Sequence, residues 1–155
     1  MNLQNLQNLI QANRLEEFDI SLKSIKAKYN QAVRRFNLAK DIMAKGSKNN
    51  DLAYSDIYDA ARLACESLLW LYGYRVKQRQ GHHAMILEVA GLILNGDLEL
   101  EFKRIKKMRK KRHDIQYDVL EILDTELIKI AEDVETFLRK VVELIEKKDL
   151  QKKLI

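Results

Sequence analysis

The sequence predicts an all-α protein that folds as an up-and-down bundle of four main antiparallel helices with one or two short extra helices. The 155-residue chain has no proline and only five glycines, too few turn residues for the many tight corners of an all-β fold. Apolar residues recur at steps of three and four over long stretches, as on one face of a helix. Hydrophobic residues make up 46% of the chain, which excludes disorder. The length suits a single domain over residues 1–155, with its core over about residues 20–148.

The first half of the sequence predicts three helices. Residues 3–10 form a short amphipathic helix. From Leu22 to Met43, apolar residues alternate steps of three and four, which predicts one long helix. The polar segment 46–51 ends that helix in a surface loop. A third helix is predicted over about residues 52–74, and small residues on it would let a neighbouring helix approach closely, namely Ala60, Ala61 and Ala64.

The second half predicts three more helices. The polar stretch 77–81 marks a turn, and the simplest role of Gly81–His83 is to shape this corner and cap the next helix. That helix is short and runs through residues 85–94. A fifth helix is predicted to start near Asp97 and a last one at Asp124, with these aspartates as N-cap residues. Because short loops join long helices, helices that are consecutive in the sequence are expected to run antiparallel.

Several features narrow the class of protein. The single cysteine, Cys65, rules out an intramolecular disulfide and fits a reducing compartment. No signal peptide is expected, and no window approaches the roughly 18 uncharged apolar residues of a membrane span, so we expect a cytoplasmic protein. No cofactor is expected, since the sequence lacks a glycine-rich phosphate loop and a serine nucleophile elbow. His82 and His83 are adjacent rather than spaced to share a helix face, which gives no support for a metal site.

Positive charge is concentrated in one short segment. The net charge is +5, yet residues 103–112 hold eight of the 28 lysines and arginines, and the rest of the chain carries 20 bases against 23 acids. Such a concentration attracts the phosphate backbone of nucleic acids. The alternative is a solvated helix face, partly paired by Glu99 and Glu101. For RNA binding, the contacts are expected from Arg104, Lys107, Arg109 and Lys111.

Arg112 stands where an apolar residue is expected. The buried stripe of the fifth helix passes through Phe102 and Ile105, and a step of seven leads to Arg112, then on to Ile115 and Val119. An inward guanidinium is costly unless an anion or hydrogen-bond acceptors meet it. Its partner is either an acid on a facing helix or a phosphate at a cleft or subunit boundary, and periodicity does not choose between the two. The candidate acids are Asp56, Asp59 and Glu66.

Arg112, His113 and Tyr117 form a short motif within two helical turns. It resembles the motif of the HEPN-domain family, compact all-helical proteins of prokaryotic toxin–antitoxin and RNA-processing systems. In that family an arginine is followed by a polar residue, and a histidine stands five to seven positions after the arginine. Tyr117 stands where this histidine usually does, as in some branches of the family. The resemblance covers roughly residues 20–148 and is carried further by segments 60–64, 73–75, 81–83 and 130–138.

The resemblance implies an activity, partners and residue roles. Active HEPN proteins are metal-independent endoribonucleases that act as homodimers with their motifs lining a shared cleft, and a toxin of this kind can be neutralised by a nucleotidyltransferase antitoxin. RNA is then the substrate, Arg112 stabilises charge on the phosphate, His113 takes part of the base role, and Tyr117 donates a hydrogen bond or a proton. Two alternatives remain. One is a non-catalytic HEPN module that binds RNA or nucleotides, since tyrosine replaces the usual histidine. The other is a helical interaction protein in which an acid pairs with Arg112.

Overall fold

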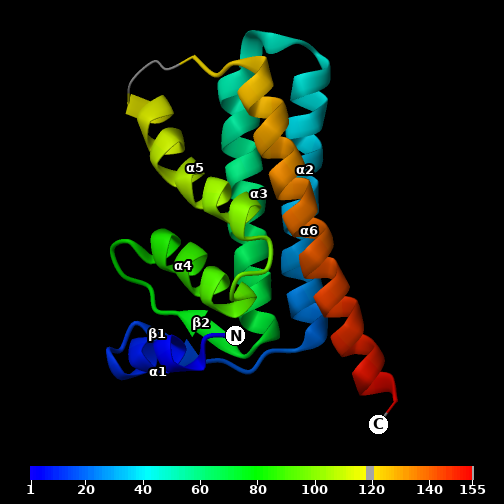
Figure 1. Cartoon of the computed structure of the whole chain (residues 1–155). Coiled ribbons are helices and arrows are strands. Elements are labelled where there is room, and N and C mark those ends of the chain that lie inside the picture. The colour runs from blue at the N-terminus through cyan, green and yellow to red at the C-terminus, as the bar shows by residue number, and fades with distance from the viewer. Residues whose placement is uncertain (118–120, 155) are drawn as a thin grey trace.

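The computed structural model describes residues 1–117 and 121–154 and confirms the all-α fold (Figure 1). Within these residues the chain forms six α-helices, one short 3₁₀ helix and two strands of three residues each. The elements in chain order are α1 (Leu3–Gln11), β1 (Leu15–Glu17), α2 (Leu22–Ala44), the 3₁₀ helix (Ser47–Asn49), α3 (Asn50–Leu71), β2 (Tyr74–Val76), α4 (His82–Leu94), α5 (Glu99–Tyr117) and α6 (Asp124–Lys153).

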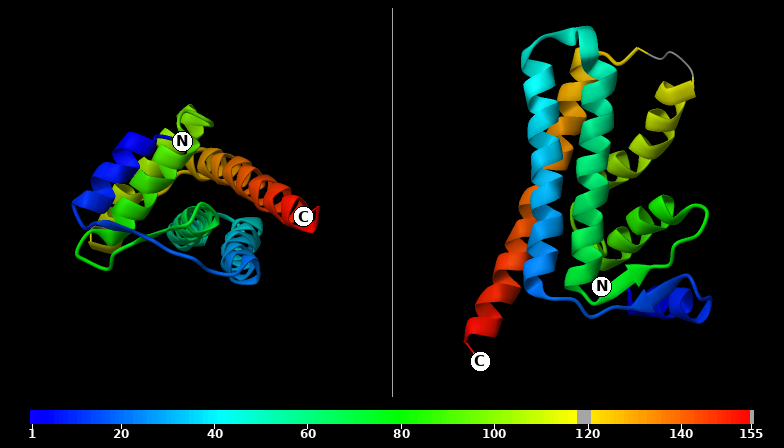
Figure 2. Two further views of the ribbon diagram at one scale, coloured as in Figure 1. Left: turned by 90° about the horizontal axis from the view of Figure 1, so that it is seen from below. Right: turned by 180° about the vertical axis from the view of Figure 1, so that it is seen from behind.

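Four long helices form the predicted up-and-down bundle, and α1 and α4 are the short extra helices. In Figure 1, α2 rises, α3 descends, α5 rises and α6 descends. Helix α3 is the central element, because it contacts α2, α4, α5 and α6. Helix α4 lies beside α3 and below α5, and the C-terminal end of α5 diverges from α3 (Figures 1 and 2). The start of α4 and the second half of α5 therefore flank the same stretch of α3.

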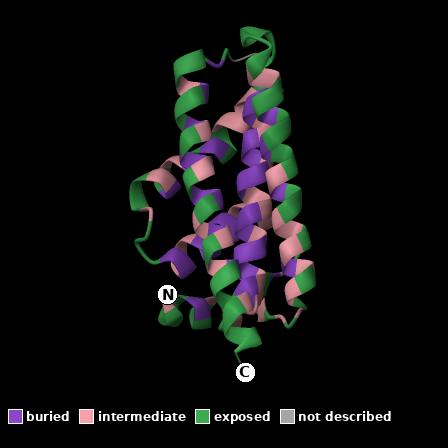
Figure 3. Cartoon of the chain, turned by 90° about the vertical axis from the view of Figure 1, so that its right-hand side faces the viewer, coloured by how far each residue is buried: buried purple, intermediate pink, exposed green. Residues whose placement is uncertain are grey.

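The core follows the predicted apolar stripes. Buried positions run along the inner faces of the long helices (Figure 3). Ala60, Ala61 and Ala64 are fully buried on α3, and their small side chains let the neighbouring helices pack closely against it. On α5 the buried residues are Phe102, Ile105 and Met108. Val119, which the sequence pattern also placed on this stripe, lies outside the described residues.

A two-stranded antiparallel sheet was not predicted. Leu15–Glu17 pairs with Tyr74–Val76, with Leu15 opposite Val76. The predicted third helix therefore ends at Leu71 rather than near residue 74. Gly73 makes this change of direction, because its φ of 85° lies in the left-handed region that favours glycine. Strands of three residues are too short to show a period of two in the sequence.

The two predicted N-caps are wrong. Helix α5 begins at Glu99, and the amide of Phe102 donates to the carbonyl of Leu98, not to Asp97. Asp124 is the first residue of α6 and Leu123 holds the cap position. The Asp124 carboxylate instead accepts hydrogen bonds at 2.7 Å from Asn50 and Ser47, and these bonds lower its pKa. Asp124 thus ties the start of α6 to the start of α3 rather than capping its own helix.

None of the helices in the described residues is long and apolar enough to cross a membrane.

Candidate functional site

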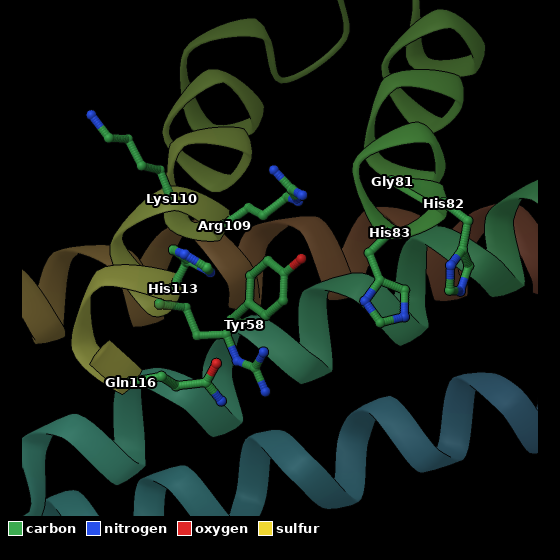
Figure 4. Close-up of a pocket in the computed structure, with 9 residues that line it drawn as sticks. Tyr58, Gly81, His82, His83, Arg109, Lys110, His113 and Gln116 are labelled. Atoms are coloured by element: carbon green, nitrogen blue, oxygen red, sulfur yellow. The ribbon is translucent and has the colours of Figure 1, made fainter. Parts of the chain in front are cut away.

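A pocket of about 360 Å³ lies between the start of α4 and the second half of α5 (Figure 4). It holds two arginines, one lysine and three histidines, and no acidic side chain of the described residues lines it. These three are all the histidines of the chain. Its volume falls in the range of about 300–1,000 Å³ that is usual for ligand sites. The lining residues are Tyr58, Gly81, His82, His83, Arg109, Lys110, Arg112, His113 and Gln116.

Helix α5 supplies one wall of the pocket through its helical repeat. Residues three and four apart share a face of a helix, so Arg109, Arg112 and Gln116 continue the face that Ile105 buries in the core. The end of α5 diverges from α3 (Figure 1), and this face therefore leaves the core and lines a cavity. The basic segment 103–112 ends here, and three of its basic residues line the pocket, namely Arg109, Lys110 and Arg112.

Helix α4 supplies the opposite wall from its first turn. Gly81 precedes the helix with a φ of 81°, a left-handed conformation that favours glycine. This turn starts α4 at His82, so His82 and His83 stand at its N-terminal end. The prediction that Gly81–His83 shapes a corner is confirmed, but no side chain caps the helix. The exposed amides of a helix N-terminus carry partial positive charge, which adds to that of the arginines.

Arg112 is held loosely. Its side chain is 29% exposed, and the closest acid is Asp59, with 3.8 Å between guanidinium nitrogen and carboxylate oxygen. That distance permits an ion pair but not a hydrogen bond. The guanidinium carbon lies 5.4 Å from the centre of the Tyr58 ring. The Nε atom is buried and has no hydrogen-bond partner among the described residues.

The other two acids that could have neutralised Arg112 are engaged elsewhere. Asp56 pairs with Arg35 at 3.2 Å, and Glu66 lies 3.7 Å from Lys28 and 3.9 Å from Arg62. Of the two partners that the sequence allowed for Arg112, an acid or a phosphate, the structure shows the acid, which is Asp59. This ion pair does not provide hydrogen-bond acceptors for the guanidinium N–H groups. A buried donor without an acceptor destabilises the fold, and an incoming anion would relieve this cost.

Tyr58 forms the floor of the pocket. The residue is 2% exposed, and Figure 4 shows its ring between the side chains of α5 and the histidines of α4. Burial raises the pKa of its hydroxyl, and the positive charges of Arg62, Arg109 and Arg112 oppose this shift. Tyr58 is thus a neutral hydrogen-bond donor beside the cations.

His83 is the histidine whose pKa is shifted. Partial burial lowers its pKa, the positive charges of Arg62 and Arg112 and the neighbouring His82 lower it further, and Asp59 opposes them. The two imidazole rings of the pair lie 4.2 Å apart. His83 therefore stays neutral at neutral pH and keeps one ring nitrogen free to accept a proton.

The structure brings only some of the predicted site residues together. Arg109, Arg112 and His113 line the pocket. Tyr117 does not line it, is 76% exposed, and packs its ring 4.8 Å from that of His113. Lys107 is exposed on another part of α5.

Two of the predicted RNA-binding residues are already paired. Arg104 donates two hydrogen bonds to the buried carboxylate of Asp133, at 2.7 and 3.0 Å. Lys111 pairs with Glu126. These contacts hold α5 against α6, so the main role of Arg104 and Lys111 in this structure is to stabilise the packing of these two helices.

Six lining residues were not predicted as part of the site, namely Tyr58, Gly81, His82, His83, Lys110 and Gln116. For Lys110 and Gln116 the signal was present, because each lies one helical turn or less from Arg112 or His113 on the same helix. The histidines of α4 and Tyr58 of α3 come from other helices, and only the tertiary fold places them beside Arg112.

No family model matches this chain, and no curated protein matches its sequence. In residues 1–117 and 121–154, no group of three or more His, Cys, Asp and Glu side chains is arranged to hold a metal ion. What this chain can bind therefore follows from the side chains that line the pocket.

Proposed function

We propose that this chain is a HEPN-type protein that acts on RNA as a metal-independent endoribonuclease, with Arg112 binding the phosphate at the cleavage point. The observation that supports this proposal is the gathering of Arg109, Arg112 and all three histidines around one pocket. RNA is a polyanion, and its phosphodiester needs a cation and proton-transfer groups for cleavage. The pocket contains both kinds of group.

Arg112 is the residue best suited to the phosphate. Its guanidinium presents a planar fork of donors that matches phosphate oxygens, and its contact with Asp59 at 3.8 Å leaves donors available. Arg109 is exposed beside it and supplies a second positive charge. Such donors bind more strongly as negative charge accumulates on the phosphate in the transition state. Positive charge for this step therefore comes from arginines.

His113 and Tyr117 extend the site away from Arg112. His113 lines the pocket, and its ring contacts that of Tyr117. Tyr117 is exposed, and its proposed role is to contact RNA outside the pocket or a second copy of the chain. The proposal includes the homodimer that the resemblance implies, with α5 of each copy at the shared cleft. The toxin role and a nucleotidyltransferase antitoxin stay predictions of the resemblance.

A second candidate function is binding of RNA or nucleotides without cleavage. It is favoured by the position of Tyr117, because the last residue of the motif contributes no group to the pocket. Both candidates need the phosphate to bind beside Arg112. They differ in whether the histidines transfer protons, and a cleavage assay separates them.

The cleavage assay uses purified protein, a labelled single-stranded RNA and excess EDTA. The proposal expects cleavage in EDTA, with 2′,3′-cyclic phosphate ends on the products, and a slower rate for His113→Ala. Tyr117→Phe is expected to cut more slowly if the hydroxyl contacts RNA. Arg139→Ala is the matched control, since Arg139 is a 77% exposed arginine on α6 that does not line the pocket.

The outcomes of the assay distinguish cleavage of RNA from binding without cleavage. RNA that binds and stays intact favours the second candidate, and its affinity should fall steeply with added salt. Cleavage at the wild-type rate by both His113→Ala and Tyr117→Phe would show that neither residue takes part in the mechanism. A protein that neither binds nor cuts RNA at low salt contradicts both candidates and leaves the helical interaction protein.

A further inference from the structure

We propose that His83 is the general base of this reaction and that His113, on the opposite wall of the pocket, is the general acid, in place of the base role that the resemblance implies for His113. This inference rests on the proposed function and assigns the proton transfers to two histidines from different helices of one chain. His83 is outside the Arg112–Tyr117 motif, and only the fold brings it to the same pocket. The pocket then holds the base, the acid and the phosphate-binding arginine.

The position of His83 supports this role. His83 lies at the start of α4 and His113 near the end of α5, so their imidazoles reach the pocket from two sides (Figure 4). Cleavage of a phosphodiester needs the base and the acid on opposite sides of the phosphorus, because the attacking and leaving oxygens are in line. In Figure 4 the ring of Tyr58 lies between the two histidines. Arg112 lines the same pocket, so its guanidinium and the Tyr58 hydroxyl are the donors for the phosphate oxygens.

The charges around His83 keep it in the form that a base requires. Arg62 and Asp59 face it from α3, Arg112 from α5 and His82 from its own helix. Burial and the cations outweigh the single carboxylate, so the pKa of His83 lies below its ordinary value of 6.5. The neutral imidazole persists to lower pH than that of an ordinary histidine. His82 is less suited, since it also borders a second cavity beside Trp70.

The step balances with the groups named. The neutral imidazole of His83 takes the proton of the ribose 2′-hydroxyl, and the 2′-oxygen forms a bond to phosphorus. The bond from phosphorus to the 5′-oxygen breaks, and the imidazolium of His113 gives that oxygen a proton. The products are a 2′,3′-cyclic phosphate and a 5′-hydroxyl, while His83 ends protonated and His113 neutral. Solvent exchange restores both histidines.

The test compares wild-type protein with His83→Ala and His83→Gln in the EDTA cleavage assay across pH. Loss of a general base lowers the rate by about 100-fold or more. In wild-type protein kcat/KM should fall as pH falls through the pKa of His83, below 6.5. Both variants should lose this acidic limb, and added imidazole should restore cleavage to His83→Ala. Arg139→Ala should keep the wild-type rate and pH profile.

Circular dichroism shows whether the variants fold, and His83→Gln retains a polar side chain of similar size if alanine disturbs the start of α4. Cleavage that survives in both variants overturns this inference alone. A loss of rate with an unchanged acidic limb and no rescue by imidazole also overturns it, because His83 would then only support the structure. Absence of cleavage by wild-type protein overturns the proposed endoribonuclease and this inference together.

Discussion

Arg112→Ala is expected to lower the rate of RNA cleavage by about 100- to 1,000-fold, the usual cost of removing one donor that stabilises transition-state charge. Arg112 is the residue of the pocket with a buried Nε that lacks a hydrogen-bond partner among the described residues. Lysine would restore the charge but not the fork of donors. Arg112→Lys should therefore cut RNA faster than Arg112→Ala and slower than wild type, as measured by initial rates on labelled RNA.

The same variant separates a functional arginine from a structural one. If the main role of Arg112 were to stabilise the fold through its ion pair with Asp59 at 3.8 Å, Arg112→Ala would destabilise the fold and leave RNA cleavage or binding unchanged. We expect the reverse, because removing a poorly satisfied guanidinium costs the fold little. Thermal unfolding of Arg112→Ala, with Arg139→Ala as the exposed control, measures this. A large drop in Tm with unaltered RNA chemistry would contradict the account.

Phe137→Ala is expected to destabilise the fold by about 3–5 kcal/mol, the range for a large-to-small change at a buried aromatic. Phe137 is fully buried on α6, and its ring lies 5.4 Å from that of Phe102 on α5. The substitution removes an aromatic contact that, together with the Arg104–Asp133 pair, holds the first half of α5 against α6. A domain of this size loses about 2–4 °C in Tm per kcal/mol, so a decrease of about 10 °C is expected.

Leu150→Ala on the same helix is the control for Phe137→Ala, since Leu150 is 59% exposed. Its Tm should change little, because exposed substitutions usually stay within about 0.5 kcal/mol. Chemical denaturation of both variants gives the free energies of unfolding. A Phe137→Ala protein as stable as Leu150→Ala would contradict the packing of α5 on α6, and with it the placement of one wall of the pocket.

The sequence was sufficient for the helices because their signal is local. The stripe from Leu22 to Met43 marks α2, and the stripe of α5 places Arg112 on the face that Ile105 buries. The strands and the caps were not predictable in the same way. Leu15 pairs with Val76 across 61 positions, and Asp124 bonds to Asn50 rather than to its own helix. Contacts of this kind depend on how distant segments meet.

The candidate site was likewise predictable only where its residues are close together in the sequence. Arg109, Arg112 and His113 were identified because they share one helix, whose charge and spacing are visible in the sequence. Tyr58 and His83 reach the pocket from α3 and α4, so no local pattern connects them with Arg112. The hydrogen-bonded ion pair between Arg104 and Asp133 could not be predicted either, because Asp133 lies on α6, 29 residues away.

The central claim is that the pocket between α4 and α5 binds an RNA phosphate. All three histidines of the chain line this pocket, so every imidazole signal in a proton NMR spectrum reports on it. The direct measurement is a titration with uridine 3′-phosphate, with uridine as the control that lacks the phosphate. The account predicts that the signals of His83 and His113 shift with the nucleotide but not with uridine, and that Arg112→Ala abolishes the shifts. Imidazole signals that stay unmoved at saturating nucleotide, or that move equally with uridine, would contradict it.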